Sequence, residues 1–209
     1  MEASATSQLE TERKYDAGPD FVLPDLSELP GYTVTEPVTF HMAATYFDTD
    51  DLRLAANKVT LRRRTGGEDD AWHLKLPVRP GTRQERHLPL DADHGTGTVP
   101  AQMQDMVADF TGGRPLRPIA QLSTVRTIRR LAGPEGDVRA EVADDHVTGR
   151  RLDAGDQDTA HDPLIWHEIE VELVSGATDV LDVAGTLLCS AGAFPSASAS
   201  KLGRVLEQG

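Results

Sequence analysis

Alternation of polar and apolar residues is the dominant pattern of the chain, and it predicts a protein built mostly of β-strands. Successive side chains of a strand point to opposite faces, so residues i and i+2 share a face. The clearest case is 164–174, where Glu168, Glu170 and Glu172 alternate with apolar residues. If the apolar side chains face the core, the three glutamates face the other side. A register slip of one residue would bury three carboxylates, so both faces of this strand are specified.

The same alternation, interrupted by turn residues, extends over most of the chain. Apolar residues at helical spacing predict helices over 100–110 and 177–193, with shorter helical segments over 20–30 and 52–56. We predict an α+β fold that is mainly antiparallel β, a closed eight-stranded barrel with a few flanking short helices, forming a single domain over 1–209. The predicted strands are 9–14, 38–47, 58–64, 72–78, 82–90, 119–131, 137–147 and 164–174.

The composition is acidic, and this changes which partners are expected. The 209 residues include 21 Lys plus Arg against 34 Asp plus Glu, a formal net charge of -13, while 38% hydrophobic residues suffice for a core. Nucleic acids and anionic membranes both require a cationic face. No apolar stretch approaches the ~20 residues that span a bilayer, and the N-terminus carries no apolar signal region. We therefore expect a cytoplasmic protein that binds neither nucleic acid nor membrane.

Familiar reactive motifs are missing from the sequence. The single cysteine, Cys189, lies in an apolar helical run and is expected to be a buried thiol. The seven histidines have no metal-ligand spacing, and His73 and His167 are expected to face the exterior or the core. There is no P-loop and no G-x-S-x-G motif, which favours metal-assisted attack by water on any phosphate substrate.

Charged residues recur at the same two-residue spacing, as in Glu10, Glu12 and Lys14 and again in Arg62 and Arg64. A solvated sheet face explains such alternation on any one strand. Like charges about 7 Å apart repel, however, and require opposite charge nearby. Because acidic and basic strands coexist, we favour faces that neutralise each other across a barrel lumen. Such a lumen would bind a polyanion through Lys and Arg while carboxylates hold a divalent metal.

Nine segments carry the chemistry in a fixed order. They are E-x-E-x-K at 10–14, Y-F-D-T at 46–49, L-R-R-R at 61–64, W-H-L-K at 72–75, R-Q-E at 83–85, Arg126, Asp145, E-I-E-V-E-L at 168–173 and S-K at 200–201. This series resembles the signature of the CYTH superfamily, the triphosphate tunnel metalloenzymes. One E-x-E-x-K motif is a weak signal, whereas the ordered series over nearly the whole chain is specific.

The resemblance implies an eight-stranded antiparallel barrel whose tunnel binds a triphosphate group, with Mg²⁺ or Mn²⁺ as cofactor. Strand alternation adds Arg139 to the basic residues that the resemblance assigns to phosphate. The substrate-binding set is therefore Lys14, Arg62, Arg64, Lys75, Arg126, Arg139 and Lys201. The expected metal ligands are Glu10, Glu12, Asp145, Glu168 and Glu170.

Glu170 and Lys14 are expected to be the catalytic residues, with Glu170 nearest the attacking water. Glu172 shares the face of Glu170, but a solvated position at the tunnel mouth explains it equally well. The expected activity is that of a metal-dependent hydrolase, an inorganic triphosphatase first, with thiamine or nucleoside triphosphates as further substrates.

Two alternatives stay open at this point: a class IV type adenylate cyclase, and a module that binds polyphosphate without turnover. The expected partner is a small-molecule triphosphate or polyphosphate. The oligomeric state is also open, with a homodimer among the alternatives.

Overall fold

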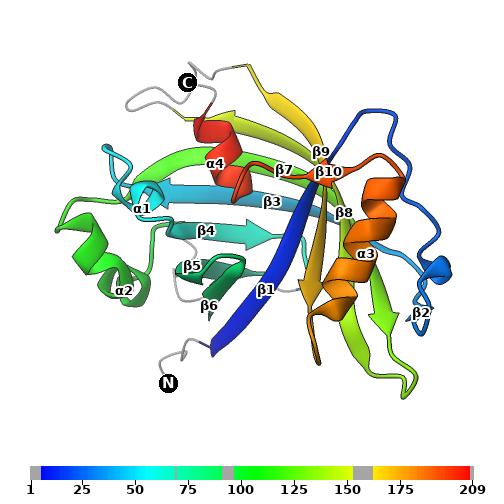
Figure 1. Ribbon diagram of the computed structural model, residues 1–209. Helices are drawn as coiled ribbons and strands as arrows, with labels where there is room; N and C mark the ends of the chain where they lie inside the picture. Colours follow the sequence, from blue (N-terminus) through cyan, green and yellow to red (C-terminus); the bar gives the residue numbers. More distant parts are fainter. Residues whose placement is uncertain (1–5, 69, 91–96, 153–161, 208–209) are drawn as a thin grey trace.

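Eight antiparallel strands close into a barrel in the computed structural model, which describes residues 6–68, 70–90, 97–152 and 162–207 (Figure 1). The order around the barrel is β1-β6-β5-β4-β3-β7-β8-β9, and β9 pairs with β1 again. The predicted closed eight-stranded barrel is therefore confirmed. Its strands are β1 (Thr6–Ala17), β3 (Val38–Asp48), β4 (Thr60–Thr65), β5 (Ala71–Arg79), β6 (Thr82–Pro89), β7 (Arg117–Ala132), β8 (Val138–Arg151) and β9 (Leu164–Leu173).

Strand β1 closes the barrel by pairing with a different strand through each of its halves. Its first half, from Thr6 to Thr11, pairs with β6, and its second half, from Glu12 to Ala17, pairs with β9. In Figure 1 this strand, in dark blue, crosses the front of the barrel obliquely. Two short strands extend the sheet: β10 (Phe194–Pro195) pairs with β1, and β2 (Thr33–Val34) pairs with β7.

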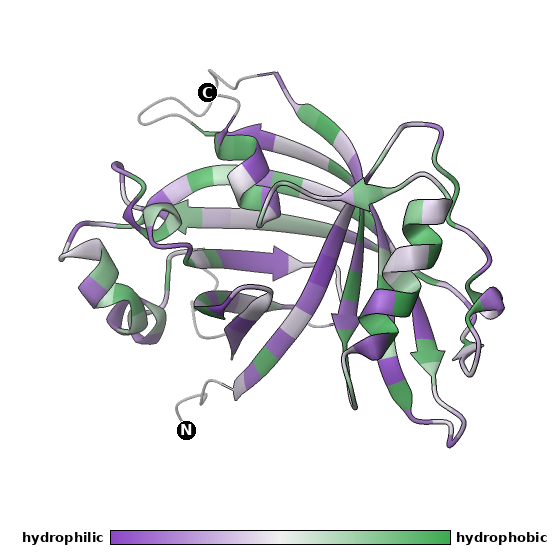
Figure 2. Cartoon of the chain, viewed as in Figure 1, coloured by the Kyte–Doolittle hydropathy of each residue, from purple (hydrophilic) through white to green (hydrophobic). Residues whose placement is uncertain are grey.

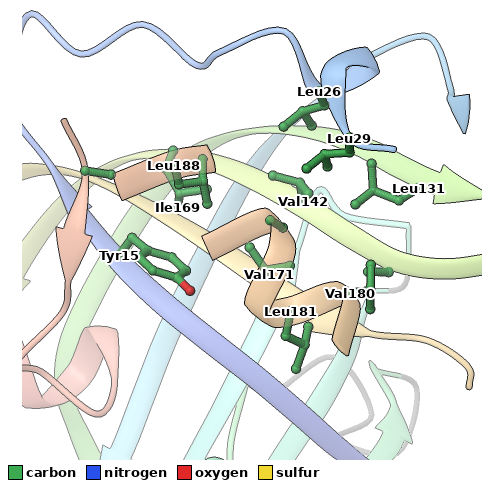
Figure 3. Packing of buried hydrophobic residues seen from close by; sticks show 13 residues of the cluster. Tyr15, Leu26, Leu29, Leu131, Val142, Ile169, Val171, Val180, Leu181 and Leu188 are labelled. Atoms are coloured by element: carbon green, nitrogen blue, oxygen red, sulfur yellow. The ribbon is translucent and has the colours of Figure 1, made fainter. Parts of the chain in front are cut away.

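The apolar faces of the strands point outward, against helices. Helix α3 (Asp179–Ser190) covers the outside of β1, β8 and β9, where Ile169 and Val171 are fully buried beside Leu181 and Leu188 (Figure 3). Strand β1 is mostly hydrophilic in Figure 2, in keeping with a strand that contributes charged residues to the lumen. Because the outer faces take the apolar side chains, the polar side chains are left for the lumen.

A second apolar cluster lies outside β4, β5 and β6. Helix α2 (Ala101–Thr111) buries Met103 there against Trp72 and Leu74. Helix α1 (Arg53–Ala56) contributes Leu54, and the buried carboxylate of Asp48 accepts hydrogen bonds from the backbone amides of Leu54 and Ala55 at 2.8 and 2.9 Å. The aspartate of the Y-F-D-T segment therefore has a structural role as a cap.

A third apolar cluster fills one end of the barrel. Helix α4 (Lys201–Leu206) packs Leu202 and Val205 against Tyr46 and Trp166. The Ser200 hydroxyl caps this helix by accepting a hydrogen bond from the Gly203 amide at 3.0 Å. No helix in the described part of the chain has the length and apolar character needed to span a bilayer.

Three local predictions differ from the structure. The helix expected over 20–30 is reduced to a 3₁₀ turn, η1 (Leu26–Glu28), because Pro24 lies inside that range and cannot donate a helical hydrogen bond. The helix α4 was not predicted. Cys189 is exposed, since it falls one position beyond Leu188 and so outside the apolar stripe of α3.

Candidate active site

A polar cavity of about 300 Å³ occupies the barrel lumen. Residues from all eight barrel strands line it, and residues of the loop between β4 and β5, with Ser200 and Lys201 at the start of α4, complete the lining. Its basic residues are Lys14, Arg62, Arg64, Lys75, Arg83, Arg126 and Lys201, and its carboxylates are Glu10, Glu12, Glu68, Glu85, Glu141, Glu170 and Glu172. Predicted basic and acidic faces thus meet in one lumen, although they lie far apart in the sequence.

The E-x-E-x-K segment of β1 is held in place by ion pairs to residues of β5 and β9 and by one pair within β1. Glu10 accepts hydrogen bonds from Lys75 Nζ at 2.6 and 2.7 Å. Lys14 Nζ donates to Glu12 at 3.0 Å and to Glu170 of the opposite strand β9. Burial alone would lower the pKa of Lys14, but Glu170 and Glu12 raise it above its ordinary value. Lys14 is therefore a permanent cation and cannot serve as a base near neutral pH.

A buried ion network forms the part of the lumen next to α4. Lys201 Nζ lies 2.9 Å from Asp145, 2.6 Å from Glu168 and 2.8 Å from Glu170. Arg126 contacts Asp145 with two nitrogens, at 2.6 and 2.8 Å, and Glu170 at 2.5 Å. Oxygens of the three carboxylates lie within 4.8 Å of one another, close enough to share a metal ion. Arg126 and Lys201 already neutralise much of the charge of these three carboxylates.

The pKa of Glu170 follows from this network. Burial alone would raise it, but Lys14, Lys201 and Arg126 hold it well below its ordinary value. Such a carboxylate stays ionised and is a weak proton acceptor. The Glu170 carboxylate is therefore suited to accepting hydrogen bonds and not to accepting a proton.

Arg62 differs from these paired cations. Its guanidinium lines the cavity, where Nη1 donates to the Tyr46 hydroxyl at 3.2 Å. Its Nε is buried and has no hydrogen-bond partner among the residues that the structure describes. The charge of Glu85 acts on this half-buried residue, but Arg62 forms no ion pair with a carboxylate in the described part of the chain, so its hydrogen-bonding capacity fits an anionic ligand.

Carboxylates dominate another part of the lining, around Glu172. This residue lies directly across from Glu12 of β1 and from Glu141 of β8. Burial, followed by repulsion from Glu10, raises the pKa of Glu172 to about 8. Lys75 pairs with Glu10 and Lys14 pairs with Glu12, so part of this negative charge is already neutralised. Carboxylate oxygens are nevertheless the ligands that Mg²⁺ and Mn²⁺ prefer, so Glu10, Glu12 and Glu172 are candidate ligands of a divalent cation. For Glu172 the sequence leaves both a lumen position and a solvated position open.

The expectation that Arg139 faces the lumen was wrong. Its side chain lies outside the tunnel, in a separate pocket with Tyr32, and its Nε contacts Asp137 at 2.7 Å. The pairing of β7 with β8 shifts at this point, because Leu131 faces Ala140 whereas Ala132 faces Val138. Arg139 is the extra residue of this β-bulge, where two-residue alternation no longer fixes the direction of a side chain.

His73 is buried, and its side chain lies on the same face of β5 as that of Lys75. It therefore points toward the lumen and not toward the exterior. It lies 3.2 Å from Glu85 through Nδ1, and His87 Nε2 is 3.2 Å from the other oxygen of Glu85. Burial lowers the pKa of His73 to about 3, so its imidazole is neutral. Sequence spacing missed this group because its contacts cross from β5 to β6.

An antiparallel barrel with acidic and basic side chains converging in its lumen has the architecture of a triphosphate tunnel. Residues 8–205 match the family model described as the CYTH domain. The chain therefore belongs to the CYTH domain family.

Two curated relatives from Mycobacterium tuberculosis support this membership. Uncharacterized protein MT2285, from strain CDC 1551 / Oshkosh, and Uncharacterized protein Rv2226, from strain ATCC 25618 / H37Rv, are each 40% identical over 207 residues. The matches cover 95% of this chain but 40% of each relative. The chain thus spans about two fifths of the length of the curated relatives it matches.

Two solved structures share the fold. A putative adenylate cyclase from Bacillus halodurans superposes with a TM-score of 0.62 at 18% identity, covering 95% of this chain and 97% of that one. The putative adenylyl cyclase HpAC1 from Hippeastrum, described as having a dominant triphosphatase activity, gives 0.60 at 17% identity, covering 96% and 95%. At these identities the likeness concerns the fold alone.

Proposed function

We propose that the chain is a metal-dependent hydrolase of triphosphate-containing compounds, with inorganic triphosphate as its first substrate. The supporting observation is the Arg62 guanidinium, which lines the cavity, donates to the Tyr46 hydroxyl and forms no ion pair with a carboxylate in the described part of the cavity. Its planar fork suits the oxygens of a phosphate group. Members of the CYTH family act on triphosphates, which agrees with this reading.

The carboxylate cluster of Glu10, Glu12 and Glu172 would hold the Mg²⁺ or Mn²⁺ ion. Burial and repulsion from Glu10 and Glu12 raise the pKa of Glu172 to about 8, so a bound divalent ion would favour the ionised form of this carboxylate. A bound ion of this kind neutralises phosphate charge and lowers the pKa of coordinated water.

The other residues would bind and orient the reactants. Lys14, Arg126 and Lys201 are fixed cations that stabilise charge on the transferring phosphoryl group. Water attacks the terminal phosphorus, the anhydride P–O bond breaks, and phosphate and diphosphate leave. Glu170, kept ionised by those cations, would accept a hydrogen bond from the attacking water and orient it.

Glu170→Gln tests that orienting role. Glutamine keeps the shape but loses the negative charge, so we expect kcat for triphosphate to fall about 100-fold. Lys14, Arg126 and Lys201 would each lose one of their carboxylate partners, so a near-native circular dichroism spectrum must accompany the loss. Unchanged turnover in a folded variant would remove Glu170 from the catalytic residues.

Adenylate cyclisation is the second candidate, and one feature of the lumen favours it. Phe40, Met42 and Ile128 line the cavity among its charged residues and offer an apolar surface to a nucleobase. Cyclisation requires the ribose hydroxyl to lie in line with the α-phosphate, and it releases diphosphate from ATP.

One screen separates these functions. The full chain is incubated with inorganic triphosphate, ATP, thiamine triphosphate or long-chain polyphosphate, each with Mg²⁺ and with Mn²⁺ in parallel. Phosphate release that is fastest from triphosphate is the expected result. Cyclic AMP formed from ATP would assign the cyclase activity instead. Tight triphosphate binding without any turnover would identify a binding module and contradict both enzymatic proposals.

A further inference from the structure

A group of two histidines and one aspartate lies on the outer surface of the barrel, outside the tunnel. Asp144 and His146 belong to β8, and His167 lies directly opposite His146 on β9. Their neighbours Asp145 and Glu168 are buried in the lumen network, so alternation directs these three side chains to the other face of the sheet.

The ligating atoms of the three residues converge. His167 Nε2 lies 2.6 Å from Asp144 Oδ1, and His146 Nε2 lies 3.9 Å from the same oxygen. The two imidazole rings stack with centroids 4.1 Å apart and an interplanar angle of 19°. One nitrogen or oxygen from each residue lies within 4.8 Å of the others, which a single ion can span.

The surroundings preorganise two of the ligands and leave the third accessible. The side chain of His167 is 7% exposed, and Phe21 packs edge-on against its ring at 5.6 Å. The side chain of Asp144 is 17% exposed, whereas that of His146 is 63% exposed. An ion can therefore reach this pair from solvent, where it would replace the hydrogen bond between His167 Nε2 and Asp144 Oδ1. His146, the exposed residue, is the ligand that turns to complete the set.

We propose that Asp144, His146 and His167 form a second metal site, selective for a borderline transition metal ion such as Zn²⁺ or Co²⁺. Two imidazole nitrogens and one carboxylate oxygen favour these ions, whereas Mg²⁺ prefers oxygen ligands alone. Three protein ligands leave a fourth tetrahedral position for water. The bound ion links β8 to β9 on their outer face, and the same two strands carry Asp145 and Glu170 on the face that points into the lumen. The ion therefore stabilises this part of the barrel wall.

Zinc binding to the full chain in excess Mg²⁺, which occupies oxygen-only sites, tests this assignment. We expect wild-type protein to bind Zn²⁺ and to gain thermal stability from it. His146→Asn removes one exposed ligand without disturbing the core, so the Zn²⁺ dissociation constant should rise at least about tenfold. Co²⁺ in place of Zn²⁺ should show visible d–d absorption bands in the wild type that are lost in His146→Asn.

His41→Asn is the matched control, since His41 is an exposed strand histidine that Val125 of β7 separates from His146. It should bind Zn²⁺ as the wild type does. Equal Zn²⁺ affinity in the wild type and His146→Asn would overturn the site. Loss of binding in His87→Asn rather than in His146→Asn would also overturn it, by assigning the ion to the cluster of His73, Glu85 and His87. None of these readouts depends on triphosphate turnover.

Discussion

Adjacent residues of one strand have opposite environments in this protein, and Arg62 and Arg63 of β4 show this most clearly. Arg62 lines the cavity, donates to the Tyr46 hydroxyl and meets no carboxylate among the described residues. Arg63 pairs with Trp72 of β5 on the outer face of the barrel. Two arginines with the same strand propensity therefore differ in whether a substrate anion can reach them.

Arg62→Gln removes the charge and keeps most of the side-chain volume. Since hydrogen bonds to charged groups contribute about 1.5–3 kcal/mol, we expect KM for triphosphate to rise at least about tenfold. Arg63→Gln is the matched control, and its KM should stay within about twofold of the wild type. Steady-state phosphate release gives both values. Equal effects in the two variants would mean that Arg62 has no particular contact with substrate.

Glu172 gives a prediction about pH. Its pKa is raised from 4.5 to about 8 by burial and by the charge of Glu10. Between these values the folded protein keeps a proton that the unfolded chain has released, so this residue lowers stability as pH rises. The contribution is fully present below pH 4.5 and is lost as pH passes about 8.

Glu172→Gln should therefore flatten the fall of Tm between pH 4.5 and about 8 in metal-free buffer. Added Mg²⁺ should raise Tm at the alkaline end in the wild type and less in the variant. Asp109→Asn, on the exposed face of α2, is the control and should keep the wild-type slope. A wild-type slope in Glu172→Gln would show that other groups set the pH dependence.

At the scale of elements, alternation along the sequence predicted the eight barrel strands and most of the lumen residues. The alternation was informative because the apolar face of each strand packs against a helix. Every second residue of the strand must then point to the opposite face, into the lumen. The alternation gave the wrong direction for Arg139, because a β-bulge at this residue interrupts the two-residue repeat. It could not find the group of His73, Glu85 and His87, because pairing between strands is set by register and not by spacing within a strand. The helix α4 was missed because its six residues are too few to show a helical period.

Close packing between α4 and β8 gives a prediction for one glycine. A Cβ on Gly149 would lie 2.6 Å from Val205 Cγ2 and 3.0 Å from the Trp166 ring. Gly149→Ala should therefore destabilise the protein by about 1–3 kcal/mol and displace α4, which carries Lys201. Gly18→Ala is the control, because its added Cβ would meet nothing within 4 Å. Thermal unfolding of both variants tests this, and equal Tm values would show that α4 adapts without cost.

The whole molecule separates its charges between inside and outside. The cavity lining holds seven basic residues and seven glutamates, so its formal charge is zero when all seven glutamates are ionised, and the formal charge of -13 belongs to the rest of the chain. An acidic exterior repels extended polyanions such as DNA, whereas a compact triphosphate can enter the lumen. An acidic net composition is therefore compatible with a phosphate substrate, because the basic residues that would bind it lie in the lumen.

This balance makes the affinity for triphosphate depend on the metal. A neutral lumen gives a polyanion little net attraction, whereas one divalent ion on the cluster of Glu10, Glu12 and Glu172 makes the lumen positive. We expect chelation of divalent ions to weaken triphosphate binding at least about tenfold, measured by calorimetry, and added Mg²⁺ to restore it. In Glu172→Gln the same chelation should change the affinity less, because one ligand is already lost. Binding that is equally tight with and without chelator would mean that the seven basic residues suffice, and that the acidic cluster has no part in holding the substrate.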